Sequence, residues 1–142
     1  MRIAVRKLLY AYNNTPPANF PDGAEPKLEV TGSDRRDLLA KIFHLKDGHE
    51  AKIEVEPPLW LDYGCNVKFE GSFYCNFNAT ILDCAEVIIG DGVLFGPNVH
   101  LYGGTHSVNP AERKSVLERA LPIKIGENCW MAGVTIGKNV TI

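Results

Sequence analysis

One stretch decides the fold: Ile89-Gly90-Asp91-Gly92-Val93-Leu94-Phe95-Gly96-Pro97-Asn98-Val99-His100-Leu101, in which an apolar residue recurs at every sixth position. The same period runs, with one interruption, from about Phe69 to Ile142. Such a period is typical of a parallel β-helix, in which each unit is a short strand plus a turn and three units make one triangular coil. The sequence therefore predicts a mainly β chain built from stacked coils.

Each repeat unit is expected to open with an inward-pointing apolar residue and to place a small or apolar residue four positions later. The expected openers are Phe69, Cys75, Ile81, Ile89, Phe95, Leu101, Ile125, Met131, Ile136 and Ile142. The expected second inward positions are Phe73, Ala79, Ala85, Val93, Val99, Cys129, Thr135 and Val140. Three segments suit coil corners because Gly and Asn tolerate a positive φ: Gly90-Asp91-Gly92, Gly126-Glu127-Asn128 and Gly137-Lys138-Asn139.

Residues 1–55 are predicted to form a short helical segment and loop that precede a β-helix over residues 56–142. Apolar residues in 2–12 follow one helical face, and 14–32 is rich in Pro, Gly, Asn and Asp, which favours a loop. Ser33 or Asp34 is the expected N-cap of a second helix. Its apolar stripe contains Leu38, Leu39, Ile42, Phe43 and Leu45. Two small helices would cover the open edge of the first coil, which otherwise exposes unpaired backbone groups.

The repeat period stops over residues 102–122, where a segment leaves the β-helix and later returns. A loop of this length in a compact domain is usually functional or disordered. It carries His106, Arg113 and Glu118 and returns through Pro122. We therefore expect this excursion to project from one edge of the β-helix and to carry functional side chains.

Composition argues against several classes of partner. A net charge of -2 and a pI near 6.1 do not favour nucleic-acid binding. No apolar run is long enough for a membrane span, and the N-terminus lacks a signal-peptide core, so we expect no membrane contact and a cytoplasmic location. The cysteines form no C-x-x-C pair, which favours reduced structural thiols and no metal site. They are Cys65, Cys75, Cys84 and Cys129.

A series of segments appears in an order that resembles a known family. The segments are Glu56-Pro57-Pro58-Leu59-Trp60-Leu61-Asp62-Tyr63-Gly64-Cys65-Asn66, Phe73-Tyr74-Cys75-Asn76-Phe77-Asn78, Leu82-Asp83, Ile89-Gly90-Asp91, Gly96-Pro97-Asn98-Val99, Thr105-His106 and Ile125-Gly126-Glu127-Asn128-Cys129-Trp130. Together they resemble the maltose and galactoside O-acetyltransferases, a family of hexapeptide-repeat enzymes, over residues 2–13 and 33–142. The resemblance implies a left-handed parallel β-helix, an exception to the right-handed crossover rule. It also implies a homotrimer with acetyl-CoA sites between neighbouring subunits.

The same resemblance implies transfer of an acetyl group from acetyl-CoA to a hydroxyl of a sugar or similar small acceptor. His106 matches the catalytic base, since an imidazole can accept the hydroxyl proton during attack on the thioester. Glu118 lies on the excursion, where it could orient that imidazole. The positions that match acceptor contacts are Arg2, Asp62, Tyr74 and Asn76.

For the cofactor end, the resemblance implies an aromatic side chain beside the CoA arm and a backbone N–H facing the developing oxyanion. Trp130 matches the aromatic residue, and Ala132 or Gly133 takes the place of the N–H donor. No metal is expected. Purely structural roles stay open for two of these residues: packing for Trp130 and a coil corner for Asn76. Asp83, in the matched segment Leu82-Asp83, is a candidate turn capper.

Departures from the family pattern keep an alternative open. After Trp130 the chain reaches Gly133-Val134-Thr135-Ile136-Gly137 sooner than the family does, and it begins and ends inside the family's usual length. These departures suggest a truncated or degenerate, non-catalytic trimeric β-helix module. A carbonic-anhydrase-like protein would need several histidines at metal spacing, which His100 and His106 alone do not provide.

Overall fold

The computed structural model describes residues 2–16, 31–46 and 52–142. Two helices come first, α1 (Arg2–Asn14) and α2 (Ser33–Phe43). Residues 17–30 of the predicted loop lie outside the described residues. The strands that follow are β1 (Ile53–Val55), β2 (Leu59–Leu61) and β3 (Val67–Phe69) in the first coil; β4 (Phe73–Cys75), β5 (Ala79–Leu82) and β6 (Val87–Ile89) in the second; β7 (Val93–Phe95), β8 (His100–Tyr102) and β11 (Ile123–Ile125) in the third; and β12 (Trp130–Met131) and β13 (Thr135–Gly137) in the fourth.

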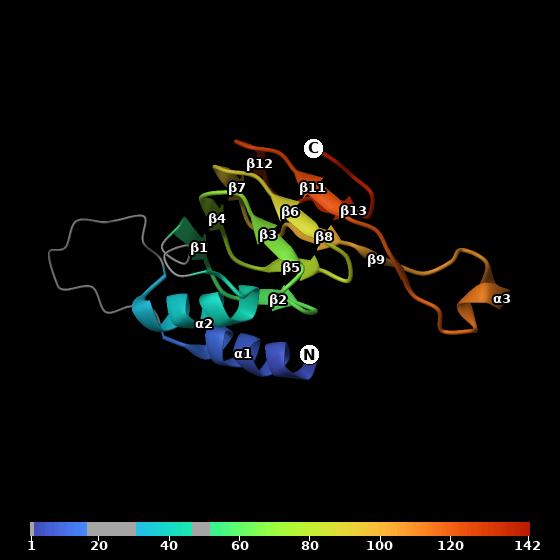
Figure 1. Cartoon of the computed structure of the whole chain (residues 1–142), viewed down its shortest axis with the longest axis horizontal. Helices are drawn as coiled ribbons and strands as arrows, with labels where there is room; N and C mark the ends of the chain where they lie inside the picture. The colour runs from blue at the N-terminus through green and yellow to red at the C-terminus, as the bar shows by residue number, and fades with distance from the viewer. Residues whose placement is uncertain (1, 17–30, 47–51) are drawn as a thin grey trace, which may run out of the picture.

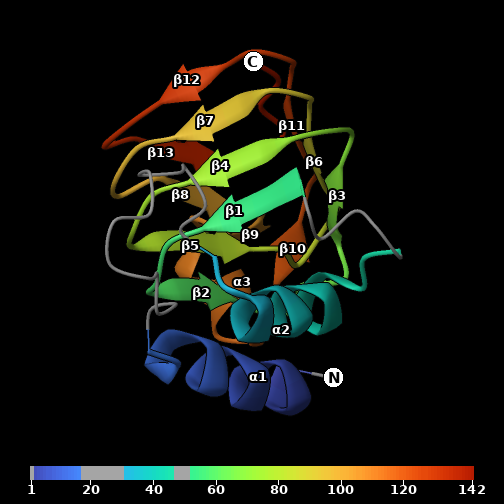
Figure 2. The same cartoon turned by 90° about the vertical axis from the view of Figure 1, so that its left-hand side faces the viewer.

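These strands stack into three parallel sheets, one for each side of a triangular prism. Sheet A contains β1, β4, β7 and β12; sheet B contains β2, β5, β8 and β13; sheet C contains β3, β6 and β11. Figure 2 looks onto sheet A, with its strands above one another and the two helices beneath them. Phe73 of β4 pairs with Ile53 below it and with Val93 above it. The stacked coils confirm the predicted parallel β-helix.

The interior of the prism is a column of apolar side chains. Phe73 and Phe95 meet edge-on, with 5.0 Å between ring centroids. Most of the expected openers are buried there: Cys75, Ile81, Ile89, Phe95, Leu101, Ile125 and Ile136. One expected inward position near the end of the chain is wrong, because Thr135 is exposed and pairs with His100 on the outer face of β8. Val140 and Ile142 flank Thr141, which bridges to Lys124, so they align with the buried Ile123 and Ile125, although they are themselves partly exposed.

The coil corner between β12 and β13 explains the misplaced Thr135. From Met131 to Ile136 the chain takes five residues, whereas the coil beneath takes six from Phe95 to Leu101. The shorter corner moves the inward position from Thr135 to the residue before it, which packs partly buried against the core. The sequence indicates this shortening, but the six-residue period does not show which position then points inward.

Other coil corners contain the expected residues with positive φ. Gly92, Asn128 and Asn139 have φ values of 69°, 57° and 59°. Gly90 is required for a different reason, since a Cβ there would lie 2.6 Å from the backbone nitrogen of Glu127 in the next coil. Left-handed backbone and close coil-to-coil approach therefore account for these residue types.

The helices cover the edge of the first coil, as predicted (Figure 1). The Tyr12 hydroxyl of α1 donates to the carbonyl oxygen of Val55 at 2.5 Å. The Asn13 side chain donates to the Leu59 carbonyl oxygen at 3.0 Å and accepts from the Leu59 N–H at 2.9 Å. These bonds satisfy backbone groups that the first coil would otherwise leave unpaired.

The start of α2 differs from the expected one. The N-cap is Gly32, with extended backbone, rather than Ser33 or Asp34, which lie in the first turn. The Asp34 carboxylate is favourable there because the helix dipole is positive at its N-terminus. Neither α1 nor α2, nor any other helix in the described part of the chain, is long and apolar enough to cross a membrane.

The excursion leaves the β-helix after Tyr102 and returns at Ile123. It contains β9 (Gly104–Thr105), α3 (Pro110–Arg113) and β10 (Arg119–Ala120). β9 and β10 pair antiparallel and form a neck from which α3 projects away from the prism (Figure 1). The side chain of Asn109 caps α3 by accepting from the Ala111 N–H at 2.9 Å. The neck is therefore the part of the excursion that stays close to the coils.

Asp83, fully buried after β5, holds the turn that follows β2. Its carboxylate accepts from the backbone N–H groups of Asp62, Tyr63 and Asn66 at 3.2, 2.8 and 3.4 Å. The Asn66 side chain in turn donates to the Asp83 carbonyl oxygen at 2.7 Å. Burial raises the pKa of the Asp83 carboxyl, and the backbone donors oppose that rise. The turn-capper interpretation of Asp83 agrees with these bonds.

We expect Ile125→Ala to destabilise the fold by about 2–5 kcal/mol, because Ile125 is fully buried and its truncation leaves a cavity. The neighbouring Lys124 is exposed, so Lys124→Ala should change the free energy of unfolding by less than about 0.5 kcal/mol. Urea unfolding followed by circular dichroism measures both. Equal losses in the two variants would contradict the inward and outward assignment along β11.

We expect Asp83→Ala to destabilise by about 2–3 kcal/mol, because it leaves buried backbone N–H groups without an acceptor. Asp83→Asn keeps one acceptor oxygen and avoids burying a charge, so its loss should be smaller. Urea unfolding of both variants tests this order. If Asp83→Asn lowered the free energy of unfolding as much as Asp83→Ala does, the hydrogen bonds to the turn would not be what Asp83 contributes.

Candidate functional site

The neck of the excursion places His106 opposite Glu118. Thr105 pairs with Arg119 and Gly104 with Ala120. His106 follows Thr105 and Glu118 precedes Arg119, so the antiparallel register puts these two residues at corresponding positions just beyond the end of the ladder. Both residues are exposed. Two residues that are twelve positions apart in the sequence are thus brought together by one short hairpin.

Cys84 connects the neck to the first coil. Its Sγ lies 3.4 Å from Oδ2 of Asp62 and 4.0 Å from Oε1 of Glu118. Burial, followed by the hydrogen bond to Asp62, raises the pKa of the Cys84 thiol to about 11. The thiol is therefore protonated at neutral pH, and it acts as a hydrogen-bond donor rather than as a nucleophile.

Gly104 allows this close arrangement. A Cβ at Gly104 would lie 3.1 Å from both the Cys84 Sγ and the Glu118 Oε1. A side chain there would push the neck away from the coil that carries Cys84. The hexapeptide period does not extend through the excursion, so it does not indicate the role of Gly104.

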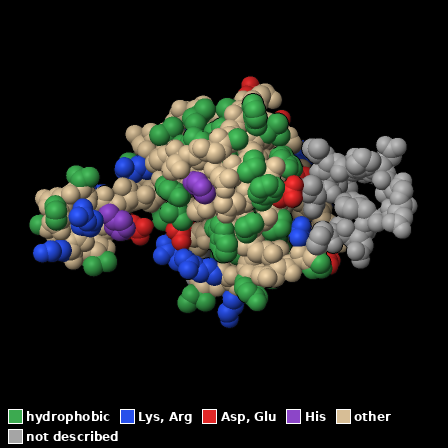
Figure 3. Space-filling view, turned by 180° about the vertical axis from the view of Figure 1, so that it is seen from behind, with side chains coloured by type: hydrophobic (Ala, Val, Ile, Leu, Met, Phe, Trp, Pro, Cys, Tyr) green, Lys and Arg blue, Asp and Glu red, His purple; other side chains and the backbone are tan. Residues whose placement is uncertain are grey.

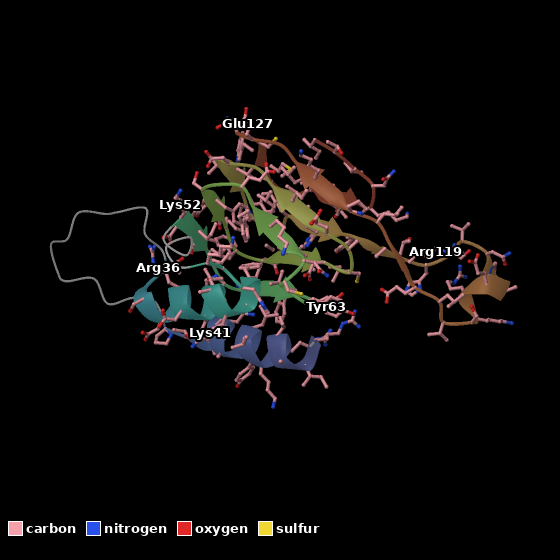
Figure 4. The ribbon with its side chains drawn as sticks, in the orientation of Figure 1. Arg36, Lys41, Lys52, Tyr63, Arg119 and Glu127 are labelled. Carbon is pink, nitrogen blue, oxygen red and sulfur yellow. The ribbon has the colours of Figure 1, made fainter. Side chains whose placement is uncertain are left out.

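Asp62 lies at the centre of a charged cluster beside the neck. The residue is only 8% exposed, and its Oδ1 lies 3.2 Å from Nε of Arg2 and 3.7 Å from Nη2 of Arg6. The Arg2 guanidinium also lies over the ring of Tyr63, 4.9 Å from its centroid, and Asp62 raises the pKa of Arg2. Figure 4 shows Tyr63 on the side of the prism from which the excursion projects. Arg2 and Asp62, predicted to contact one acceptor, are thus in contact with each other.

Tyr74 and Asn76 belong to a different side of the molecule, on β4 of sheet A and the turn after it. The Tyr74 hydroxyl donates to Oε1 of Glu56 at 3.1 Å, and burial, followed by this bond, raises the pKa of Tyr74. The Asn76 side chain accepts from the Phe77 N–H at 2.7 Å. Within a single chain, Tyr74 and Asn76 therefore lie apart from Asp62 and the excursion.

The three residues predicted at the cofactor end lie in the last coil. Trp130 pairs with Leu94 in sheet A and is 77% exposed. Ala132 and Gly133 form the shortened corner after it, and both are exposed. The Gly133 N–H donates to the Pro97 carbonyl oxygen at 2.9 Å, so this amide holds two coils together. Trp130 offers a free aromatic face, whereas the Gly133 amide already has an acceptor.

The site also contains residues that the sequence did not indicate. Arg6 and Tyr63 join the cluster at Asp62, and Cys84 links it to Glu118. Their contacts cross from α1 and the neck to the first two coils, and no local pattern signals such contacts. Within residues 2–16, 31–46 and 52–142, no group of three or more His, Cys, Asp or Glu side chains could hold a metal ion.

Comparison with known proteins identifies relatives of the chain, although no family profile matches it. The chain is 35% identical over 148 residues to the galactoside O-acetyltransferase of Escherichia coli, an alignment that covers 99% of the chain and 66% of that protein. The chain spans between 55% and 66% of the length of four curated relatives that it matches.

Solved structures give the same result. A maltose O-acetyltransferase from Clostridium difficile superposes with a TM-score of 0.80 at 32% identity, covering 99% of this chain and 67% of that one. A galactoside acetyltransferase in complex with coenzyme A gives a TM-score of 0.74, also at 32% identity, with 99% and 63% covered. The shared fold confirms the left-handed β-helix expected from the resemblance. The chain therefore belongs to the maltose and galactoside O-acetyltransferase family of hexapeptide-repeat proteins.

Proposed function

We propose that the protein transfers an acetyl group from acetyl-CoA to a hydroxyl of a sugar or similar small acceptor. The observation that carries this proposal is the neck of the excursion, where Cys84 contacts both Glu118 and Asp62 and where His106 directly follows the paired residue Thr105. The relatives named above act, by their names, on galactosides and maltose, and a further relative is a sophorolipid acetyltransferase. All of these names imply a sugar hydroxyl as the acceptor.

The geometry supports a general-base mechanism. Acetyl-CoA supplies the acetyl group as a thioester. His106 takes the proton of the acceptor hydroxyl as its oxygen attacks the acyl carbon, and then gives that proton to the CoA sulfur as the thioester bond breaks. Glu118, opposite His106, orients the imidazole and stabilises its protonated form. Asp62 and Arg2 position the acceptor by hydrogen bonds to its other oxygens, which lowers the entropic cost of the reaction.

The cofactor end of the proposed site is the last coil. The exposed Trp130 provides an apolar surface for the CoA arm, and its neighbour Leu94 extends that surface along sheet A. Because the Gly133 amide already donates to Pro97, the backbone N–H of Ala132 is the better choice as donor to the acyl oxygen. These residues need no metal for their part in the reaction.

We further propose that the site is completed by a second copy of the chain in a homotrimer. Tyr74, Asn76 and Trp130 lie on the side of sheet A, whereas His106 and Asp62 lie at the excursion, so residues assigned to one reaction are separated within one chain. Apolar side chains gather over the back of the β-helix (Figure 3). On sheet A itself, Leu94 and Trp130 are large, apolar and exposed. Packing sheet A of one copy against the excursion of another would bury apolar surface and join both halves.

The cytoplasm is the compartment that fits this proposal. Acetyl-CoA is used there, and Cys65, Cys75, Cys84 and Cys129 are all free thiols. The alternative function is a non-catalytic trimeric module of the same family. The observation that favours it is the shortened corner, in which the Gly133 amide is bound to Pro97. CoA release in the presence of sugars distinguishes the two.

We expect His106→Ala to lower kcat by about 10²–10⁴-fold, the range for loss of a general base, with acetyl-CoA affinity nearly unchanged. Lys114→Ala, at an exposed position of the same excursion, is the control and should retain wild-type rates. CoA release is measured with a panel of sugars, and acetyl-CoA affinity by calorimetry. Transfer that survives His106→Ala within threefold would overturn the assignment of the base. A wild-type chain that binds no acetyl-CoA and releases no CoA would favour the non-catalytic module.

A further inference from the structure

The turn after β5 holds Cys84 in place beside Asp62. Its neighbour Asp83 is fully buried and accepts three backbone N–H groups from the turn after β2, one of them that of Asp62 itself. Because Asp83 ties the two turns together, the backbones of Cys84 and Asp62 are held at a fixed separation. The Cys84 side chain is half-buried, and its Sγ lies 3.4 Å from Oδ2 of Asp62.

The neck of the excursion is attached to the same part of the second coil. The Gly103 N–H donates to the Leu82 carbonyl oxygen at 3.1 Å, and a Cβ at Gly103 would lie 3.0 Å from that oxygen. A Cβ at the next residue, Gly104, would lie 3.1 Å from both the Cys84 Sγ and the Glu118 Oε1. Two consecutive glycines therefore let the neck lie closer to Cys84 than residues with side chains could.

The Cys84 thiol lies between two carboxylates. Its Sγ is 3.4 Å from Asp62 and 4.0 Å from Glu118, so the single thiol proton is donated to Asp62 and the Glu118 carboxylate packs against the sulfur. Burial, then the hydrogen bond to Asp62, then the charges of Asp62 and Glu118 raise the pKa of the thiol to about 11. A neutral thiol between two anions adds no further negative charge to the cluster.

The two oxygens of Asp62 have different partners. Oδ1 pairs with Arg2 and Arg6 of α1, whereas Oδ2 lies beside Cys84. The Asp62 charge, and to a smaller extent that of Glu118, raises the pKa of Arg2, so Arg2 attracts both carboxylates. Without the sulfur, the Glu118 carboxylate would have the Arg2 guanidinium as an alternative partner. The sulfur thus keeps Glu118 apart from the cluster that α1 makes with Asp62.

We propose that Cys84 is a positioning residue that fixes the separation of the Asp62 and Glu118 carboxylates. The inference rests on the proposed function, in which Asp62 holds the acceptor and Glu118 orients the imidazole of His106. The acceptor hydroxyl and the imidazole must meet within hydrogen-bond reach, so a small change in that separation lowers the rate. Gly104 assists by leaving free the space beside the sulfur and the Glu118 carboxylate.

The kinetic test replaces the sulfur and the glycine beside it. Cys84→Ala should lower kcat by about 10–100-fold, the range for a misplaced reacting group, with acetyl-CoA affinity unchanged. Cys84→Ser keeps a hydrogen-bond donor and should recover part of that loss. Gly104→Ala pushes the neck away from the sulfur and should resemble Cys84→Ala. Lys114→Ala, exposed on the same excursion, should retain the wild-type rate.

A double-mutant cycle separates positioning from a general loss of structure. Once Glu118→Ala has removed the carboxylate, adding Cys84→Ala should cost less than about threefold more in kcat, because residues that act through one another are not additive. Losses that multiply in full, in a protein whose wild type releases CoA, would overturn the positioning role and leave the proposed function standing.

The contacts of Cys84 are tested without turnover by alkylation with iodoacetamide at mildly alkaline pH, followed by mass spectrometry of the peptide that contains Cys84. The thiolate is the reacting form, and a thiol pKa lower by about half a unit gives about threefold more of it. Asp62→Asn should therefore speed alkylation about threefold or more, and Glu118→Gln by less. Glu127→Gln should not change the rate, since Glu127 is exposed at the far end of the prism from Tyr63 (Figure 4).

The two kinds of measurement tell the possible failures apart. Alkylation that neither Asp62→Asn nor Glu118→Gln accelerates would refute the contacts of Cys84 and its positioning role with them. Alkylation that responds as expected, in a wild type that releases no CoA with any sugar, would refute the proposed function. The positioning role would then fall with it, although the contacts of Cys84 would hold.

Discussion

The parallel register between coils is the constraint on which the rest of the structure depends. Each strand hydrogen-bonds to the strand of the next coil with the same residue of the repeat aligned, as Phe73 is with Val93. This alignment stacks inward side chains into one column and outward side chains into rows on each sheet. A row such as Tyr74, Leu94 and Trp130 is therefore a fixed feature of the fold. We expect functional surfaces where these rows meet the excursion or the helix α1.

Two additions to the coils supply that meeting point. The excursion interrupts the third coil and returns through a hairpin neck, which brings Glu118 to Cys84, just after β5 of the second coil. The helix α1 covers the open edge and brings Arg2 and Arg6 to Asp62. The Asp62 turn is itself fixed by buried hydrogen bonds to Asp83. The coils thus carry the Asp62 carboxylate, and α1 brings two arginine side chains to it.

Sequence reasoning succeeded where a residue's environment depends on the repeat alone. The inward positions of Ile81, Ile89 and Phe95 follow from the period, since every unit is copied by the next. It fails where one residue changes the count: the six-residue period predicts Thr135 to point inward, but the corner before it is a residue short and Thr135 is exposed. It also could not find the link from Cys84 to Glu118, because that contact depends on how the excursion folds back. The residues that the family resemblance indicates lie on two different sides of one chain.

That division makes subunit complementation the most direct measurement of the central claim, that one site is built from two chains. His106→Ala and Asn76→Ala chains carrying different affinity tags are co-expressed, and trimers containing both are isolated by two successive purifications. If His106 and Asn76 of one site come from neighbouring copies, about one third of the sites in every mixed trimer contain both native side chains. Acetyl transfer should then return to about one third of the wild-type rate, although each parent trimer is nearly inactive. Mixed trimers no more active than the parents would contradict the account.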